Sequence, residues 1–175
     1  MASVIGSRIG WKDKETTVAW PGRSSDRINW NGVDLILSAA HNSESLSHDL
    51  GRLGQERHVL VVGMTQKQDL SETTEPLLRS DCRIQTVVTE VHGGRTPSVP
   101  AGELSKILSG HSEVAPMIIE EPIEAVDGAS RLAIEEGCIV YVTGSVYLVG
   151  RVVGELASRE GGDLWDYLEA HPSRS

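Results

Sequence analysis

Hydrophobic residues follow two alternating patterns along the chain. Short unbroken apolar runs, rich in Val, Ile and Leu, alternate with longer segments whose apolar residues recur every three or four positions. The unbroken runs predict strands buried on both faces, and the helical spacing predicts amphipathic helices that cover them. The predicted strands are Val33–Leu37, His58–Val62, Ile84–Val88, Met117–Ile119 and Cys138–Val142. The predicted helices are Ser43–Leu53, Asp69–Leu78, Ala101–Leu108, Ile123–Ile134 and Ser145–Ala157.

This alternation is typical of a parallel sheet in which a helix connects each strand to the next. It predicts an α/β fold, a Rossmann-like three-layer sandwich. Its mostly parallel sheet is expected to have about six strands, with helices on both faces. The additional strand is expected near the N-terminus, where Thr16–Trp20 and Arg27–Trp30 flank the turn Pro21-Gly22-Arg23 as an edge strand or hairpin.

The two ends of the chain are expected to be appendages to one domain. Residues 1–17 form an N-terminal extension, residues 18–158 form the domain, and residues 159–175 form a terminal helix and tail. In that helix, Leu164, Trp165 and Leu168 share one side. A helix this short is unstable alone, so this side is expected to pack on the same chain, with a dimer contact as the alternative.

The charge and composition argue against several classes of function. The formal net charge is −9 over 175 residues, which disfavours nucleic acid and anionic membrane surfaces as partners. The sequence contains no apolar run long enough to cross a bilayer and no signal-peptide pattern, so the cytoplasm is the expected location. Two cysteines far apart make neither a disulfide framework nor a zinc pattern.

Polar residues follow four of the predicted strands. They occupy Ser38–Asn42, Gly63–Lys67, Thr89–Arg95 and Thr143–Ser145. Ligands of open parallel sheets bind outside the carboxyl ends of the strands, so these segments are expected to line a binding crevice.

The turn Thr143-Gly144-Ser145 leads directly into a helix and has two interpretations. Backbone amides, the helix dipole and two hydroxyls suit a bound phosphate or carboxylate. The alternative, which the spacing alone favours, is that Ser145 only caps the helix and Gly144 only eases a tight turn.

The pair His41-Asn42 is open to the same two interpretations. Asn42 suits an N-cap, and His41 offers an imidazole to a ligand. Further candidate ligand contacts are Arg23, a clamp for phosphate or carboxylate, and, secondarily, Ser38, Lys67 and Arg95. For the basic residues the alternative is an ordinary solvated side chain. The expected partner is therefore a small anion, either a phosphate or a carboxylate.

Several catalytic motifs are absent from the sequence. It has no Gly-Lys dipeptide and hence no Walker A phosphate loop, no G-x-G-x-x-G and no G-x-S-x-G. No cluster of His, Cys, Asp and Glu has metal-ligand spacing, so no metal site is predicted.

The sequence resembles one known family in a set of ordered motifs. These are Trp20-Pro21-Gly22-Arg23, Ala40-His41-Asn42, the segment Arg95–Leu104 and the segment Thr143–Gly150, which reads TGSVYLVG. Together they resemble the C-terminal domain of folylpolyglutamate synthase and dihydrofolate synthase, of the Mur ligase superfamily. The resemblance covers roughly Val18 to Leu156.

The resemblance implies a Rossmann-like domain that closes over a central ATPase domain. That ATPase domain supplies the phosphate loop and metal ligands, and the reaction activates a carboxylate as an acyl phosphate for attack by the amine of glutamate. It also implies that Arg23 and His41 face the nucleotide or acyl phosphate, and that Ser145 lies on the amino-acid side.

Two departures from the family pattern weaken the case for catalysis. The family motif Asp-Gly-Ala-His-Asn reads Ser38-Ala39-Ala40-His41-Asn42 here, which removes a carboxylate, and the family's Asp-Lys-Asp reads Lys67-Gln68-Asp69. They favour a stand-alone domain that binds a small anion or a partner and lacks complete catalytic machinery. The alternative is the C-terminal module of an ATP-dependent amide-forming glutamate ligase that needs a separate ATPase domain. No catalytic residue is assigned, and ATP and Mg are expected only alongside such a domain.

The purified chain alone is therefore expected not to release phosphate from ATP in the presence of glutamate and a folate. No phosphate loop holds the β- and γ-phosphates with Mg²⁺. A phosphate-release assay with and without glutamate measures this. Glutamate-dependent release at about 1 s⁻¹, an ordinary enzymatic rate, would contradict the prediction.

Overall fold

The computed structural model describes residues 27–110 and 114–162. The predicted terminal helix and the motif containing Arg23 lie outside these residues. The strands are β1 (Arg27–Trp30), β2 (Val33–Leu37), β3 (His58–Val62), β4 (Arg83–Val88), β5 (Met117–Ile118) and β6 (Ile139–Thr143). The helices are α2 (Ser43–Leu53), α3 (Leu70–Leu78), α4 (Ala101–Ser109), α5 (Pro122–Glu136) and α6 (Val146–Arg159).

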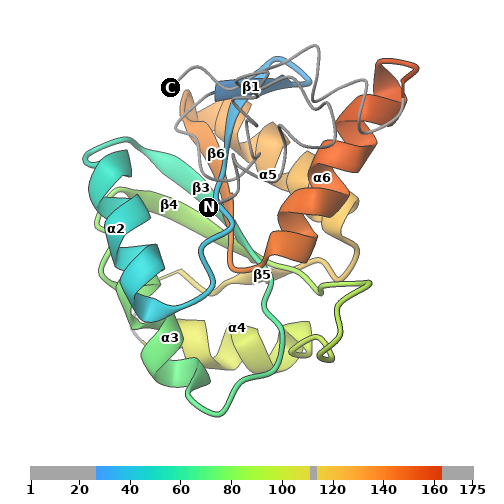
Figure 1. Cartoon of the computed structure of the whole chain (residues 1–175). Helices are drawn as coiled ribbons and strands as arrows, with labels where there is room; N and C mark the ends of the chain where they lie inside the picture. The colour runs from blue at the N-terminus through green and yellow to red at the C-terminus, as the bar shows by residue number, and fades with distance from the viewer. Residues whose placement is uncertain (1–26, 111–113, 163–175) are drawn as a thin grey trace, which may run out of the picture.

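The described strands form one six-stranded sheet in the order β1-β2-β6-β3-β4-β5 (Figure 1). β1 runs antiparallel to β2 at one edge, and all other pairs are parallel. The last of the described strands, β6, lies between β2 and β3 near the centre of the sheet. The predicted α/β fold with a mostly parallel sheet is confirmed.

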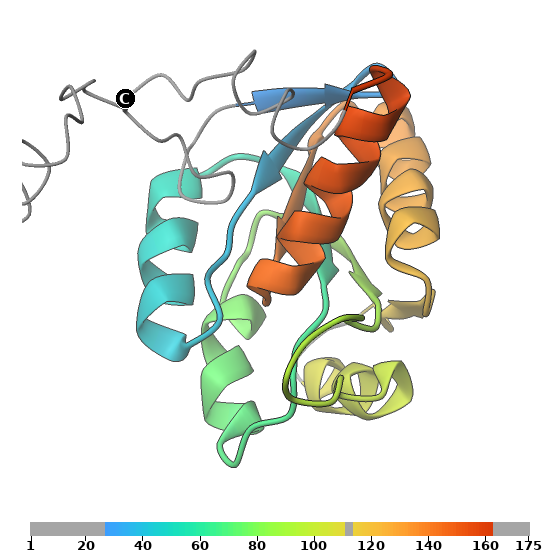
Figure 2. The same cartoon turned by 45° about the vertical axis from the view of Figure 1, so that its right-hand side comes forward.

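Helices cover both faces of the sheet and make two hydrophobic cores. α5 and α6 pack on one face, with residues such as Val126, Val149 and Val152 buried against the strands. α2, α3 and α4 pack on the other face, with Leu46, Leu77 and Leu104 among their buried residues (Figure 2). Every residue of β3 and β6 is buried, which explains why both strands read as unbroken apolar runs.

The predicted boundaries match the structure closely in the first half of the domain. Val33–Leu37, Ser43–Leu53 and His58–Val62 are reproduced as predicted. The strand predicted at Cys138–Val142 is displaced by one residue: β6 is Ile139–Thr143, because Thr143 still pairs with Val62. The other elements differ from their predicted ranges by up to two residues at an end.

The edge strand β1 is joined to β2 by a tight Asn31-Gly32 turn. Both turn residues have positive φ, 52° and 91°. Asn-Gly suits such a two-residue hairpin because both residues tolerate left-handed backbone conformations. The edge strand predicted at Arg27–Trp30 is confirmed, and the turn predicted at Pro21–Arg23 lies outside the described residues.

A polar cluster fixes the hairpin to the helices behind it. The Trp30 ring is buried, and its indole N–H donates to Asp127 Oδ1 on α5 at 2.7 Å. The Arg159 guanidinium of α6 lies 4.0 Å from the centroid of the Trp30 ring. The cluster therefore joins β1, α5 and α6.

His58 is a buried titratable residue at the start of β3. Its Nδ1 lies 2.8 Å from the Glu56 carbonyl oxygen, which can only accept, so Nδ1 carries the proton. Burial lowers the pKa of His58, and the nearby Arg83 charge adds to the effect. The folded protein therefore prefers His58 neutral.

We expect His58 to make the protein less stable as the solution becomes acidic. Because the folded pKa lies below the unfolded value of about 6.5, the unfolded chain takes up the proton first as pH falls, which favours unfolding. This contribution to stability is complete above about pH 6.5 and is lost as pH falls toward the folded pKa. Urea unfolding of wild type and His58→Gln between pH 7.5 and 5 measures it, and the variant should lose stability less steeply. The matched control is the exposed His92→Gln, which should keep the wild-type slope. Parallel slopes for wild type and His58→Gln would contradict the assignment.

Candidate functional site

Three loops meet at the carboxyl ends of β2, β3 and β6. The Gly144 N–H donates to the Ala40 carbonyl at 3.0 Å, which joins the loop after β2 to the loop after β6. The Gly63 N–H donates to the Thr143 carbonyl at 3.4 Å, which joins the loop after β3 to the same point. Segments more than a hundred residues apart therefore share one rim, as expected for an open parallel sheet.

Gly144 makes this meeting sterically possible. Its φ is +104°, and a Cβ at this position would lie 2.6 Å from the Gly63 carbonyl oxygen. No other residue fits this backbone conformation and this distance without moving the loops. The glycine of the turn is thus required by the close approach of two strand ends.

Ser145 is the N-cap of α6. Its hydroxyl accepts the Tyr147 N–H at 3.2 Å, and the side chain is buried. The capping interpretation of this serine is confirmed, and contact with an anion stays a prediction. Thr143 is also buried, and its hydroxyl lies 3.3 Å from Ser38 Oγ and 3.4 Å from the Ala40 carbonyl oxygen.

Asn42 caps a helix, whereas the His41 side chain is exposed to solvent. Asn42 Oδ1 accepts the Ser45 N–H at 2.8 Å and forms a capping box at the start of α2. His41 is exposed, and its Nδ1–H donates to the Ala39 carbonyl at 3.0 Å. Nε2 has no partner in the part of the chain that the structure describes, so it is the ring nitrogen available to a ligand.

Ser38 is hydrogen-bonded to a carboxylate, although the sequence motif that contains this serine has none. Its buried hydroxyl donates to Asp49 Oδ2 at 2.6 Å, and Asp49 comes from α2. Asp49 was not among the predicted site residues. Its position offers one signal: it lies between Leu46 and Leu53, on the helical stripe that otherwise faces the core.

The basic candidates Lys67 and Arg95 lie in the loops after β3 and β4. Lys67 is half-buried, and burial lowers its pKa. It lines a cavity of about 570 Å³ between the start of α3 and α4. Arg95 is exposed in the loop after β4. That loop passes close to Tyr147, since a Cβ added at Gly94 would lie 3.3 Å from the tyrosine ring.

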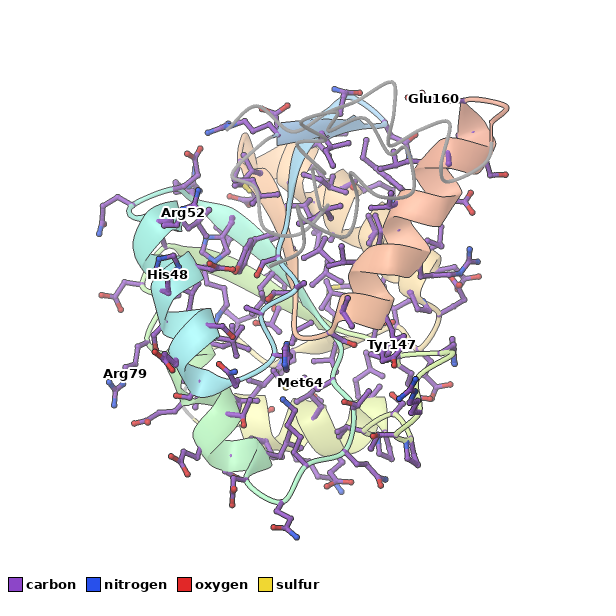
Figure 3. All side chains as sticks on the ribbon, in the orientation of Figure 1. His48, Arg52, Met64, Arg79, Tyr147 and Glu160 are labelled. Carbon is purple, nitrogen blue, oxygen red and sulfur yellow. The ribbon has the colours of Figure 1, made fainter. Side chains whose placement is uncertain are left out.

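Figure 3 shows Tyr147 and Met64 at the end of the sheet where these loops meet. Within residues 27–110 and 114–162, no three His, Cys, Asp or Glu side chains are grouped to hold a metal ion. In the same residues no helix is both long and apolar enough to span a bilayer.

We expect Gly144→Ala to destabilise the protein by at least about 2 kcal/mol, from left-handed strain and displacement of the Gly63 loop. Chemical denaturation measures the loss. Gly150→Ala is the matched control, because Gly150 is helical with open space around its Cβ position. That change should raise stability by up to about 1 kcal/mol. Equal effects of the two substitutions would show that the close approach at Gly144 is not a constraint.

Solved structures of folylpolyglutamate synthases have the same fold as this chain. E. coli FolC in complex with ADP matches with 21% identity and a TM-score of 0.64, over 82% of this chain and 33% of that one. The bifunctional folylpolyglutamate synthase/dihydrofolate synthase from Yersinia pestis matches with 25% identity and a TM-score of 0.60, over 79% and 31%. The Mycobacterium tuberculosis folylpolyglutamate synthase complexed with ADP and AMPPCP matches with 20% identity and a TM-score of 0.65, over 75% and 31%.

The matched regions show which share of the solved structures this chain corresponds to. It spans about a third of the length of the solved structures, as one domain of a larger enzyme does. No protein-family model matches the sequence, and no curated protein sequence does either. The resemblance to the C-terminal domain of folylpolyglutamate synthase, predicted from the motifs, is confirmed in the fold.

Proposed function

We propose that this domain binds a small anion, a phosphate or a carboxylate, at the rim where the loops after β2 and β6 meet, and that it lacks complete catalytic machinery of its own. The observation that carries the proposal is the hydrogen bond between Gly144 and Ala40. It joins the residue before His41 to the residue before Ser145, so the exposed imidazole and the start of α6 belong to one rim.

The chemistry of this rim suits an anion. α6 has 14 residues, and the amides of its first turn carry the positive end of the helix dipole. His41 adds a ring nitrogen that donates when the imidazole is protonated. The net charge of −9 does not prevent binding, because salt confines the field of distant charges to about 10 Å at 0.1 M.

Affinity is expected to be weak. The rim is open to solvent, so we expect a dissociation constant on the order of millimolar for a simple anion. The remaining candidate contacts within this proposal are Arg23, Asn42, Lys67 and Arg95. Ser38 and Thr143, being buried, act behind the rim.

A second candidate function is the C-terminal module of an ATP-dependent amide-forming ligase. Two observations support it: the similar E. coli and Mycobacterium tuberculosis structures are complexes with ADP and with ADP and AMPPCP, and this chain covers about a third of each. In that role a separate domain or subunit supplies the phosphate loop, and ATP and Mg bind between the two. Glutamate-dependent phosphate release that requires both components would favour this candidate.

The anion site is tested by titrating the ¹⁵N-labelled chain with inorganic phosphate. We expect amide shift changes concentrated at His41 and at residues 144–148, because these line the rim. His41→Ala should weaken binding about fivefold, equivalent to roughly 1 kcal/mol.

Arg79→Ala is the matched control. Arg79 is an exposed cation beyond the end of α3, and its removal should leave phosphate binding unchanged. Shift changes spread over the whole surface, or equal losses in the two variants, would mean that phosphate does not bind at the rim.

A further inference from the structure

Asp49 is a partly buried carboxylate behind the candidate site. Its side chain is 25% exposed and projects from α2 toward the end of β2. One oxygen, Oδ2, accepts the Ser38 hydroxyl at 2.6 Å, a short distance typical of a charge-assisted hydrogen bond. The other, Oδ1, lies 3.1 Å from Nδ1 of the exposed His48.

The bond to Asp49 decides how the Ser38 hydroxyl is used. A serine hydroxyl has one hydrogen and two lone pairs. Because the hydrogen is committed to Asp49, the oxygen is left as an acceptor. It receives the Ala40 N–H at 3.1 Å, and the Thr143 hydroxyl approaches it at 3.3 Å.

These acceptor contacts fix the backbone on which the rim depends. Ala40 is held through its N–H by Ser38, and its carbonyl accepts the Gly144 N–H at 3.0 Å. His41 is the next residue, and its ring is anchored to the Ala39 carbonyl. A chain of hydrogen bonds thus runs from Asp49 on α2 to the turn that begins α6.

We infer that Asp49 is a positioning residue for the candidate site, which holds the loop bearing His41 against the Thr143–Ser145 turn through the Ser38 hydroxyl. The effect on ligand binding rests on the proposed function, whereas the effect on the loop does not. Asp49 touches no ligand in this role. Without an acceptor at position 49, the Ser38 hydroxyl turns to other acceptors and the Ala40 N–H loses its fixed partner.

Tyr141 supplies a matched control inside the same buried region. Its hydroxyl lies near Ser38 and Thr143, yet it is the one buried side-chain polar atom of the described residues with no hydrogen-bond partner. Burial raises the pKa of Tyr141, so the hydroxyl stays neutral. Removing it takes away a polar atom near Ser38 and Thr143 but none of the hydrogen bonds that run from Asp49 through Ser38 and Ala40 to Gly144.

The test compares Asp49→Ala, Asp49→Asn and Tyr141→Phe by amide hydrogen exchange and by phosphate titration. Asp49→Ala should speed exchange of the Ala40 and Gly144 amides about tenfold and weaken phosphate binding about fivefold. Asp49→Asn keeps an acceptor for Ser38 and should stay near wild type in both measurements. Tyr141→Phe should match wild type, because an unpaired buried hydroxyl contributes nothing favourable.

The outcomes separate this inference from the proposed function. If wild type binds no phosphate but Asp49→Ala still speeds hydrogen exchange of the Ala40 and Gly144 amides, the proposed function fails and the positioning role stands. If Asp49→Ala leaves the two amides and phosphate binding unchanged, the inference is overturned. It is also overturned if Asp49→Ala speeds exchange evenly across the sheet, or if Asp49→Asn behaves like Asp49→Ala.

Discussion

The close approach of two strand ends at Gly144 is the constraint on which the rest of the candidate site depends. β6 fits between β2 and β3 only if the chain can leave it within contact distance of the Gly63 carbonyl, and only a residue without a Cβ does so. Once the chain passes that point, Ser145 caps α6 and the Gly144 amide reaches Ala40. The position of the rim therefore follows from backbone sterics before any polar side chain contributes.

Polar contacts act differently at the two ends of the sheet. At the hairpin end, Trp30, Asp127 and Arg159 form a partly buried cluster that includes a ring, a carboxylate and a guanidinium. The Arg159 and Asp127 side chains stay 34% and 31% exposed, so solvent still screens their attraction, and such pairs contribute about 0–1 kcal/mol each. At the rim end, the hydrogen bonds run between loops and leave His41 exposed. The polar contacts at the hairpin end therefore join β1 to α5 and α6, whereas those at the rim end join loops and leave the His41 side chain exposed to solvent.

Much of the fold could be predicted from the sequence because strands that are buried on both faces have unbroken apolar sequences. β3 and β6 are buried on both faces, so their apolar runs have a single interpretation. The order of the strands in the sheet could not be predicted from local patterns, because the residues around Ile139 do not indicate that β6 lies between β2 and β3. The strand order is therefore known from the structure alone.

The site was predictable in its backbone and less so in its side chains. The loops after the strands follow from the general rule for parallel sheets, and the caps Asn42 and Ser145 follow from residue type. Asp49 was missed because its importance arises from contact with Ser38, 11 residues away, which no motif encodes. Arg23 is a prediction that the described residues do not reach.

The central position of β6 also has a consequence for how the chain is synthesised. Among the described strands, the one that pairs with both β2 and β3 is synthesised last, and its pairing with β2 spans more than a hundred residues. Until it is made, β2 and β3 each present an unpaired edge, the kind of surface on which chains aggregate. Parallel pairing at this separation forms slowly, since loop closure must precede the contacts that reward it. The domain is thus expected to complete its folding only once β6 has been synthesised, and a chain cut before Ile139 should be a substrate for chaperones.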